Sequence, residues 1–272
     1  MKALLKFVLL WAVLMRVGSL QGQPICSFKE IESEIDSVRA VHRPEDVLVL
    51  FDVNYTLLFV DHPAMYIPNI KQHPIEMQVI MQGLSKEEQN IVIGLATKAE
   101  PQRVVEESIP GTIQRIKNSG VKVLALSAAL SGMFCGLDSE EWFYSTLKSF
   151  DIDFSSSFQN IDSFTFNDFP LYNNSLPTYN KGIVLTNKCD KGAVLVSFLK
   201  RTGYHPKMVV LVDNKKANIE EMEATLKAFD PQMGFMGLNY SRGQEYAPQN
   251  IDGDSFLKWW RLLPFNLTYV GE

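Results

Sequence analysis

The sequence has 272 residues, 46% of them hydrophobic and 21% charged, which is enough for one substantial core or for a core with a small accessory lobe. The formal net charge is −5 and no block of Lys and Arg occurs, so the composition excludes a protein that binds nucleic acid through clustered positive charge. We therefore expect no nucleic-acid partner.

The first residues have the features of a secretory signal peptide. Lys2 and Lys6 precede an apolar run that ends at Arg16, which is too short to cross a bilayer comfortably, and small residues follow it. We expect residues 1–22 to be a signal peptide, so that the protein is periplasmic or secreted and meets a membrane only during export. The alternative is an uncleaved membrane anchor.

Cysteines and histidines give no sign of a structural metal site. Cys26, Cys135 and Cys189 lack the Cys-x-x-Cys spacing, and the four histidines lack the spacing of zinc ligands. In an exported protein one disulfide and one free thiol would be compatible with three cysteines, and the sequence leaves the pair open.

The first strong strand signal ends in polar residues. Residues 30–38 fit a short amphipathic helix, and residues 47–51 form an apolar run of strand length that ends on Asp52, followed by Asn54 and Thr56. In open α/β sheets, ligands bind at the carboxyl ends of parallel strands. Asp52 and Asn54 are therefore candidate functional residues, although an Asp at this place can also simply begin a turn.

Residues 62–104 interrupt the strand pattern with helical signals. Prolines follow the first strand, and Ser85 and Glu88 form a capping-box pattern ahead of an apolar stripe at helical spacing. We expect a small helical insertion over residues 62–104.

A regular alternation of helices and strands follows. A helix is expected over 110–120 and another over 138–150, and a buried strand over 121–127 ends on Ser127, next to Ala128. Residues 159–181 are rich in Asn and Pro and have the composition of a loop.

The last third of the chain repeats the pattern of a strand that ends in polar residues. After a short strand at 182–186, Lys191 lies in the first turn of a helix, where the helix dipole disfavours a cation, so Lys191 is expected to serve an anionic group nearby. A buried strand at 207–213 ends on Asp213 and Asn214. A helix at 217–226 and a strand at 234–240 follow, and the apolar residues near the C-terminus are expected to pack in the core or at its edge.

Four polar positions in this order resemble the four motifs of the haloacid dehalogenase-like (HAD) superfamily, whose members are mostly phosphatases. They are Asp52-x-Asn54-x-Thr56, Ser127, Lys191 and Asp213-Asn214. The longer pattern resembles a bacterial HAD-like family of unknown function, DUF2608. The resemblance spans about residues 46–240 and implies an α/β fold, a Rossmann-like three-layer sandwich with a parallel sheet. Residues 23–61 and 105–272 would form this core, and residues 62–104 would be a small helical cap over the active site.

The resemblance also implies roles for these residues in phosphoryl transfer. Asp52 would be the nucleophile and a Mg²⁺ ligand, and the main-chain carbonyl of Asn54 and the side chains of Asp213 and Asn214 would supply the other ligands. Ser127, Ala128 and Lys191 would bind the phosphoryl group. The catalytic residues would be Asp52, Asn54, Ser127 and Lys191. The implied cofactor is Mg²⁺, and the implied partner is a small phosphorylated substrate or a phosphoprotein.

Asn54 departs from the HAD phosphatase pattern, which has Asp at this position. An amide cannot protonate a leaving group, and loss of general acid–base help typically costs about 10²–10⁴ in rate. Three functions therefore stay open: a slow exported phosphohydrolase, a weak or inactive protein that binds a phosphorylated ligand or a protein, and a dehalogenase-like hydrolase.

Overall fold

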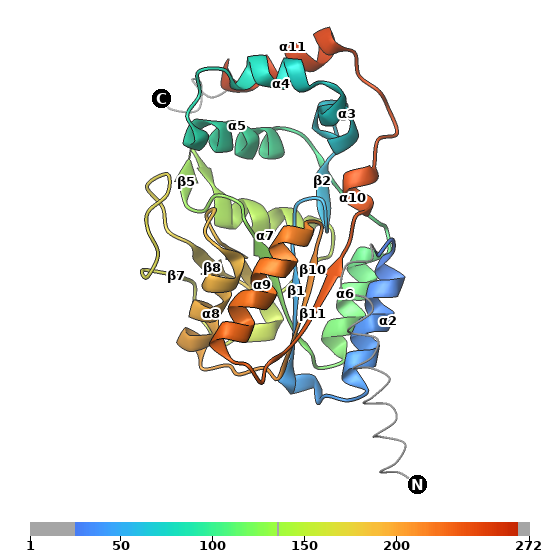
Figure 1. Cartoon of the computed structure of the whole chain (residues 1–272), viewed down its shortest axis with the longest axis vertical. Helices are drawn as coiled ribbons and strands as arrows, with labels where there is room; N and C mark the ends of the chain where they lie inside the picture. Colours follow the sequence, from blue (N-terminus) through green and yellow to red (C-terminus); the bar gives the residue numbers. More distant parts are fainter. Residues whose placement is uncertain (1–24, 135, 266–272) are drawn as a thin grey trace.

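The computed structural model describes residues 25–134 and 136–265, and these residues are built around a mostly parallel seven-stranded sheet (Figure 1). In spatial order the strands are β11 (Gly234–Asn239), β10 (Met208–Asp213), β1 (Val47–Phe51), β4 (Lys122–Ser127), β9 (Ile183–Leu185), β8 (Thr178–Asn180) and β7 (Phe164–Thr165). Each adjacent pair among the first five strands is parallel. Strand β8 pairs antiparallel with β9, and β7 pairs antiparallel with β8. The predicted α/β class with a parallel sheet is thus confirmed for the main part of the sheet.

Helices cover both faces of the sheet. One face packs against α2 (Phe28–Arg39), α6 (Ile109–Asn118) and α7 (Ser139–Ser149), and the other packs against α8 (Lys191–Thr202) and α9 (Lys216–Phe229). Strand β1 contributes Val49 and Phe51 to the first core and Leu48 and Leu50 to the second, because successive side chains of a strand point to opposite faces. This arrangement is consistent with a Rossmann-like three-layer sandwich.

Local capping explains where the helices of the sandwich begin and end. The Asp138 carboxylate accepts a hydrogen bond from the Glu141 amide at the start of α7, and Asp190 accepts one from the Ala193 amide at the start of α8. Helix α8 ends at Gly203, whose φ of 65° is the left-handed conformation that glycine adopts readily.

Residues 159–181 differ from the predicted loop because they contain β7 and β8. Each strand is only two or three residues long, so neither gives a periodic signal in the sequence. Pairing with β9 extends the sheet and buries the Tyr179 side chain. These strands depend on a neighbouring strand edge, which local composition does not reveal.

A separate group of helices lies at one end of the sheet (Figure 1). Between β2 (Leu58–Val60) and its antiparallel partner β3 (Gln102–Val104), the chain forms η2 (Pro63–Met65), α3 (Ile67–Gln72), α4 (Pro74–Met81) and α5 (Lys86–Ala99). The predicted capping box is present at α5, where Ser85 and Glu88 exchange side-chain to backbone hydrogen bonds. Residues 62–104 are therefore largely helical, as the sequence indicated.

The C-terminal helix α11 (Gly253–Phe265) packs on α4 and α5. Trp260 is 1% exposed, lies in a third apolar core with Val60, Met65 and Val92, and donates from its indole nitrogen to the Ala64 carbonyl at 3.2 Å. The sequence predicts residues 105–272 as one core domain, whereas the apolar face of α11 is buried against helices of the 62–104 insertion. The remaining elements are η1 (Pro44–Asp46), β5 (Met133–Phe134), β6 (Leu137–Asp138), η3 (Ser155–Phe158) and α10 (Arg242–Glu245).

Two sequence interpretations concern residues that lie partly or wholly outside the described ranges. The proposed signal peptide, residues 1–22, lies outside them, as does Cys135. Cys26 and Cys189 are both free thiols, so they do not pair with each other. Within residues 25–134 and 136–265, we find no helix with the length and apolarity needed to span a membrane.

Candidate functional site

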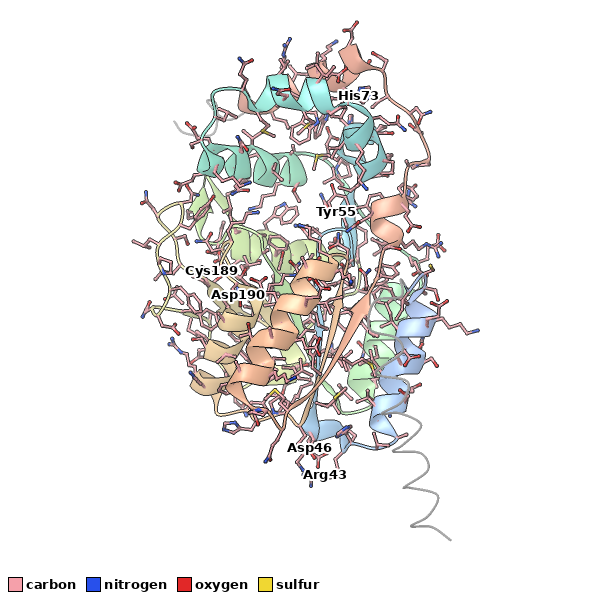
Figure 2. All side chains as sticks on the ribbon, viewed as in Figure 1. Arg43, Asp46, Tyr55, His73, Cys189 and Asp190 are labelled. Carbon is pink, nitrogen blue, oxygen red and sulfur yellow. The ribbon has the colours of Figure 1, made fainter. Side chains whose placement is uncertain are left out.

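A cavity of about 370 Å³ lies between the carboxyl end of the sheet and the separate helices. Figure 2 shows Tyr55, in the turn between β1 and β2, between these two parts, whereas Arg43 and Asp46 lie at the far end of the sheet. The sheet side of the cavity presents mainly polar residues and the helical side mainly apolar ones. The predicted site residues that line it are Asp52, Asn54, Ser127, Ala128 and Asn214.

A buried ionic triad lies beneath the cavity; Asp52 lines the cavity, whereas the predicted site residues Lys191 and Asp213 lie behind Asp52 and do not line it. The Lys191 ammonium contacts Asp52 Oδ1 at 2.6 Å and Asp213 Oδ2 at 2.7 Å, and all three residues are at most 6% exposed. Strands β1 and β10 are adjacent and parallel, so their ends bring both carboxylates to the first turn of α8. The expectation that Lys191 serves an anionic group is confirmed, and it serves two.

Burial and charge set the protonation of the triad. Burial raises the pKa of Asp52 to about 6; the Asp213 charge acts in the same direction, and Lys191 opposes both. For Lys191, burial by itself would lower the pKa, but the two carboxylates outweigh it, and the pKa is raised. Lys191 is thus held as a cation beneath Asp52.

Asp52 has unused acceptor capacity on the cavity side. Its Oδ1 accepts from Lys191, and its Oδ2 accepts from the Thr56 hydroxyl at 3.1 Å. A carboxylate offers about four acceptor sites, so about two remain. The side chain is oriented from below and is still able to bind a further group from the cavity.

Asp213, in contrast, is saturated by hydrogen bonds. Its Oδ1 accepts from the Lys215 amide at 2.8 Å, Asn218 Nδ2 lies 3.0 Å from both oxygens, and Lys191 takes Oδ2. Asp213 is fully buried, whereas its neighbour Asn214 lines the cavity. Of Asp213 and Asn214, Asn214 is the residue that lines the cavity.

A tight turn after β1 brings Asn54 to the cavity. The Val53 carbonyl accepts from the amides of Leu57 and Leu58, and Tyr55 has a left-handed φ of 64°. The Tyr55 hydroxyl donates to the Met65 carbonyl at 2.8 Å, which ties this turn to the helical side. The same turn therefore positions Asn54 and joins the two sides of the cavity.

Ser127 and Ala128 lie at the end of β4, beside the turn that holds Asp52. Ser127 is 1% exposed, and its hydroxyl accepts a hydrogen bond from the Ala129 amide at 3.3 Å. The Ser127 carbonyl accepts from the Thr186 amide at 2.8 Å, which anchors the strand end to the β9 end. Ser127 thus lines the cavity at a strand end that backbone hydrogen bonds hold in place.

The oxygen donors around the cavity suit a hard cation better than a transition metal. Among the residues the structure describes, no cluster of three or more His, Cys, Asp and Glu side chains could hold a metal ion. The cavity does present the Asp52 carboxylate and the amide groups of Asn54 and Asn214. Mg²⁺ is commonly held by one or two carboxylates together with water and substrate phosphate, so this donor set fits Mg²⁺ bound together with a phosphorylated ligand.

Several cavity residues were not indicated by the sequence, among them Lys188, Lys215 and Asn218. Asn218 lies in the first turn of α9, and its position could have been inferred from the expected helix there. Lys188 and Lys215 gave no comparable signal, because an isolated lysine in a turn usually faces solvent.

A family model described as "Protein of unknown function (DUF2608)" matches residues 24–258, which is most of the chain. The chain belongs to the DUF2608 family. The match includes every predicted site residue, the helices α3, α4 and α5, and the first part of α11, so the DUF2608 model covers both sides of the cavity.

Similar proteins occur in several Rickettsia species, each described as an uncharacterized protein. A protein of Rickettsia felis is 27% identical over 184 residues, covering 66% of this chain and 62% of its own length. One of Rickettsia bellii is 25% identical over 203 residues, covering 73% of this chain and 69% of its own. The protein RP296 of Rickettsia prowazekii is 25% identical over 214 residues, covering 76% and 74%. The matched region therefore covers about three fifths of the length of the R. felis protein.

Proposed function

We propose that this protein is an exported, Mg²⁺-dependent phosphohydrolase of the HAD type, with Asp52 as the nucleophile. The observation that carries the proposal is the Asp52 carboxylate, which faces the cavity while Lys191 and Thr56 hold it from below. A carboxylate fixed at the end of a parallel strand, beside a buried cation, is suited to attack an electrophile that enters from the cavity.

In the proposed reaction, Asp52 attacks the phosphorus atom and the bond to the leaving oxygen breaks. The product of this step is an aspartyl phosphate, which water then hydrolyses to release inorganic phosphate and restore the carboxylate. Bound Mg²⁺ would offset the charge of the phosphate dianion and align it with the nucleophile. Asp52, the Asn54 carbonyl and Asn214 would hold that ion.

The other residues of the floor have supporting roles in this proposal. The Ser127 hydroxyl would donate to a phosphoryl oxygen, and the Ala128 backbone would line the same position. Lys191 would orient Asp52 and counter the charge that gathers there, with Asp213 holding Lys191 in place. Asp213 would act on the substrate only through Lys191.

Asn54 limits which substrates can be turned over quickly. It cannot donate a proton to the leaving oxygen, so substrates whose leaving group departs unaided should react fastest. Aryl phosphates are such substrates, whereas alkyl phosphates need the missing acid. Asn54→Asp should therefore raise kcat/KM for an alkyl phosphate by about 10-fold or more and change that for an aryl phosphate little.

The direct experiment measures hydrolysis of p-nitrophenyl phosphate with Mg²⁺ and with a chelator. Wild type should be active only with Mg²⁺, and Asp52→Asn should lose activity by at least about 10³-fold. Asp46→Asn is the matched control, because Asp46 is at the other end of β1 and pairs with Arg43 and Lys207 away from the cavity. Equal activity of the Asp52→Asn and Asp46→Asn variants would refute the proposed mechanism.

The second candidate is a weak or inactive HAD-like protein that binds a phosphorylated ligand or a protein partner. Asn54 is the observation that favours it, because the group that speeds both steps in HAD phosphatases is absent. It predicts Mg²⁺-dependent binding of phosphate without turnover, and no gain from Asn54→Asp on either class of substrate.

Export is part of the proposal and has its own test. It rests on the charged and apolar pattern of residues 1–22. N-terminal sequencing of the protein recovered from its natural host should begin near residue 20–24, and an intact N-terminus on cytoplasmic protein would refute export.

A further inference from the structure

We propose that Lys188 and Lys215 form a second anion-binding subsite in the cavity, so that the preferred substrate is an organic phosphate carrying another anionic group, such as a carboxylate. This inference rests on the proposed function for the phosphoryl end of the ligand. Lys188 and Lys215 themselves belong to none of the motifs that identified the floor of the cavity.

The two lysines reach the cavity from different elements. Lys188 lies in the turn between β9 and α8, and Lys215 is the residue that precedes α9. Both line the same cavity as Asp52, and Lys188 also lines a smaller cavity of about 50 Å³ together with Asn54 and Ile93. A ligand anchored on Asp52 would therefore lie within the space that these ammonium groups border.

The turn that presents Lys188 is held in a conformation that non-glycine residues rarely adopt. Asn187 and Lys188 both have left-handed φ angles, of 50° and 67°. Asn tolerates this conformation, whereas two such residues in succession are unfavourable unless other contacts compensate. The turn is therefore maintained by its surroundings.

Asn187 provides that compensation. It is fully buried, its Oδ1 accepts from the Ser131 amide at 3.2 Å, and its Nδ2 donates to the carbonyls of Tyr172 and Ser175 at 2.9 Å each. The Asn187 amide also donates to the Ala129 carbonyl at 3.1 Å. These hydrogen bonds fix the backbone from which Lys188 extends into the cavity.

Lys188 and Lys215 bring two positive charges to a cavity beneath which the two carboxylates and one ammonium of the triad carry one net negative charge. Within residues 25–134 and 136–265, neither Lys188 nor Lys215 makes an ion pair, in contrast to Lys191, which has two carboxylate partners. The Lys188 side chain is exposed, and partial desolvation at the cavity, followed by the like charges of Lys215 and Lys86, lowers the pKa of Lys188. Like charges gathered at one place favour the binding of an anion.

A single phosphoryl group would not need these lysines. Lys191 already lies beneath Asp52, and the proposed Mg²⁺ would neutralise the phosphate itself. A cavity of about 370 Å³ also has room for a ligand much larger than phosphate, and Phe59, Met65 and Ile93 give its helical side an apolar surface. The ligand that fits has an apolar middle and an anionic group at each end.

The test compares pairs of ligands that differ only in the second anion. Phosphonocarboxylates with two to five carbon atoms are matched with alkylphosphonates of the same chain length, and binding is measured by calorimetry with Mg²⁺. At least one phosphonocarboxylate should bind about 10-fold more tightly than its matched alkylphosphonate. The chain length that gives the largest affinity ratio between the two ligands of a pair would indicate how far apart the two subsites lie.

Variants then assign the advantage to the two lysines. In the double variant with Lys188→Gln and Lys215→Gln, the phosphonocarboxylate should bind at most about twofold more tightly than its matched alkylphosphonate. The affinity for the alkylphosphonate itself should change by less than about twofold. Lys216→Gln is the matched control, since Lys216 follows Lys215 directly but pairs with Glu220 on the surface. It should retain the full advantage.

The outcomes separate the subsite from the phosphohydrolase. The second subsite is refuted if no phosphonocarboxylate binds more tightly than its matched alkylphosphonate, or if the double variant keeps the same affinity ratio. Neither result would contradict the proposed phosphohydrolase activity. An equal loss of binding for both ligand classes in the double variant would also refute the second subsite, since the lysines would then serve the phosphoryl group. If wild type binds no alkylphosphonate but binds phosphonocarboxylates through these lysines, the subsite stands and the proposed function fails.

Discussion

The floor of the cavity and its helical side are stabilised in opposite ways. The floor consists of the ends of β1, β4 and β10 with the start of α8, and it buries the charges of Asp52, Lys191 and Asp213 in mutual contact. The helical side, formed by α3, α4, α5 and α11, is held by an apolar core around Trp260. The floor therefore depends on electrostatic pairing and hydrogen bonds, whereas the helical side depends on the close packing of apolar surfaces.

This difference affects how each part tolerates change. Removing one member of a buried ion pair leaves an uncompensated charge, which is strongly destabilising. Removing a large apolar side chain leaves a cavity whose cost depends on how far the surroundings can collapse. The floor should therefore respond to charge and pH, and the helical side to side-chain volume.

The largest effect is expected for Lys191→Met. Asp52 and Asp213 would stay buried without their cation, so the free energy of unfolding should fall by about 3–5 kcal/mol at about pH 7. The loss should shrink toward about pH 5, because burial and repulsion from Asp213 raise the pKa of Asp52, and protonation of Asp52 removes one of the two uncompensated charges.

Urea unfolding of wild type and Lys191→Met at both pH values measures this effect. Lys216→Met is the control, because Lys216 belongs to an exposed pair whose removal should change stability by only about 0.5 kcal/mol. A loss below about 1 kcal/mol, or one independent of pH, would show that the triad does not behave as a buried charge cluster.

Trp260→Ala should have the next largest effect. Trp260 is buried at the centre of the helical side, and its loss should cost about 3 kcal/mol, at the lower end for Trp because the outer helices can partly collapse. Leu262→Ala in the same helix should cost about 0.5 kcal/mol or less, since that side chain is 52% exposed.

Hydrogen exchange locates the damage from Trp260→Ala. Amides of α4 and α5 should exchange faster than in wild type, while those of β1 and β10 keep their protection. Equal loss of protection in the sheet would mean that the two parts unfold as one unit and that the comparison between them does not hold for stability.

The smallest effect is expected for Ser85→Ala at the start of α5. The Ser85 hydroxyl accepts from the Glu88 amide at 3.2 Å, and loss of such a cap typically costs about 1 kcal/mol. Ser145→Ala is the control, because Ser145 is an exposed serine inside α7 and has no capping role. Thermal denaturation of both variants should therefore show a lower melting temperature for Ser85→Ala alone.

Much of the secondary structure was predictable because its signals are local. The apolar run that ends on Asp52 and the capping box at Ser85 each act within a few residues, and each lies where the sequence indicated. The order of polar residues at strand ends also placed Asp52, Ser127 and Lys191 at one edge of the sheet, because neighbouring parallel strands end together.

The short strands β7 and β8 and the position of α11 were not predictable in this way. Strands of two or three residues gain their stability from the partner edge, so Phe164 and Tyr179 show no periodic pattern. The apolar face of α11 would fit any apolar surface, and only the three-dimensional arrangement brings Trp260 to η2 and α5.

The helices, most strands and the chemical groups at the strand ends follow from the sequence, because helix caps and apolar periodicity are properties of neighbouring residues. How those groups are used depends on the three-dimensional arrangement of the chain. Folding pairs Lys191 with two carboxylates, turns Asp213 away from the cavity and Asn214 toward it, and brings Lys188 and Lys215 to the same cavity. Such relations join residues that are distant in the chain, and their energies depend on burial and distance, which exist only after the chain has folded.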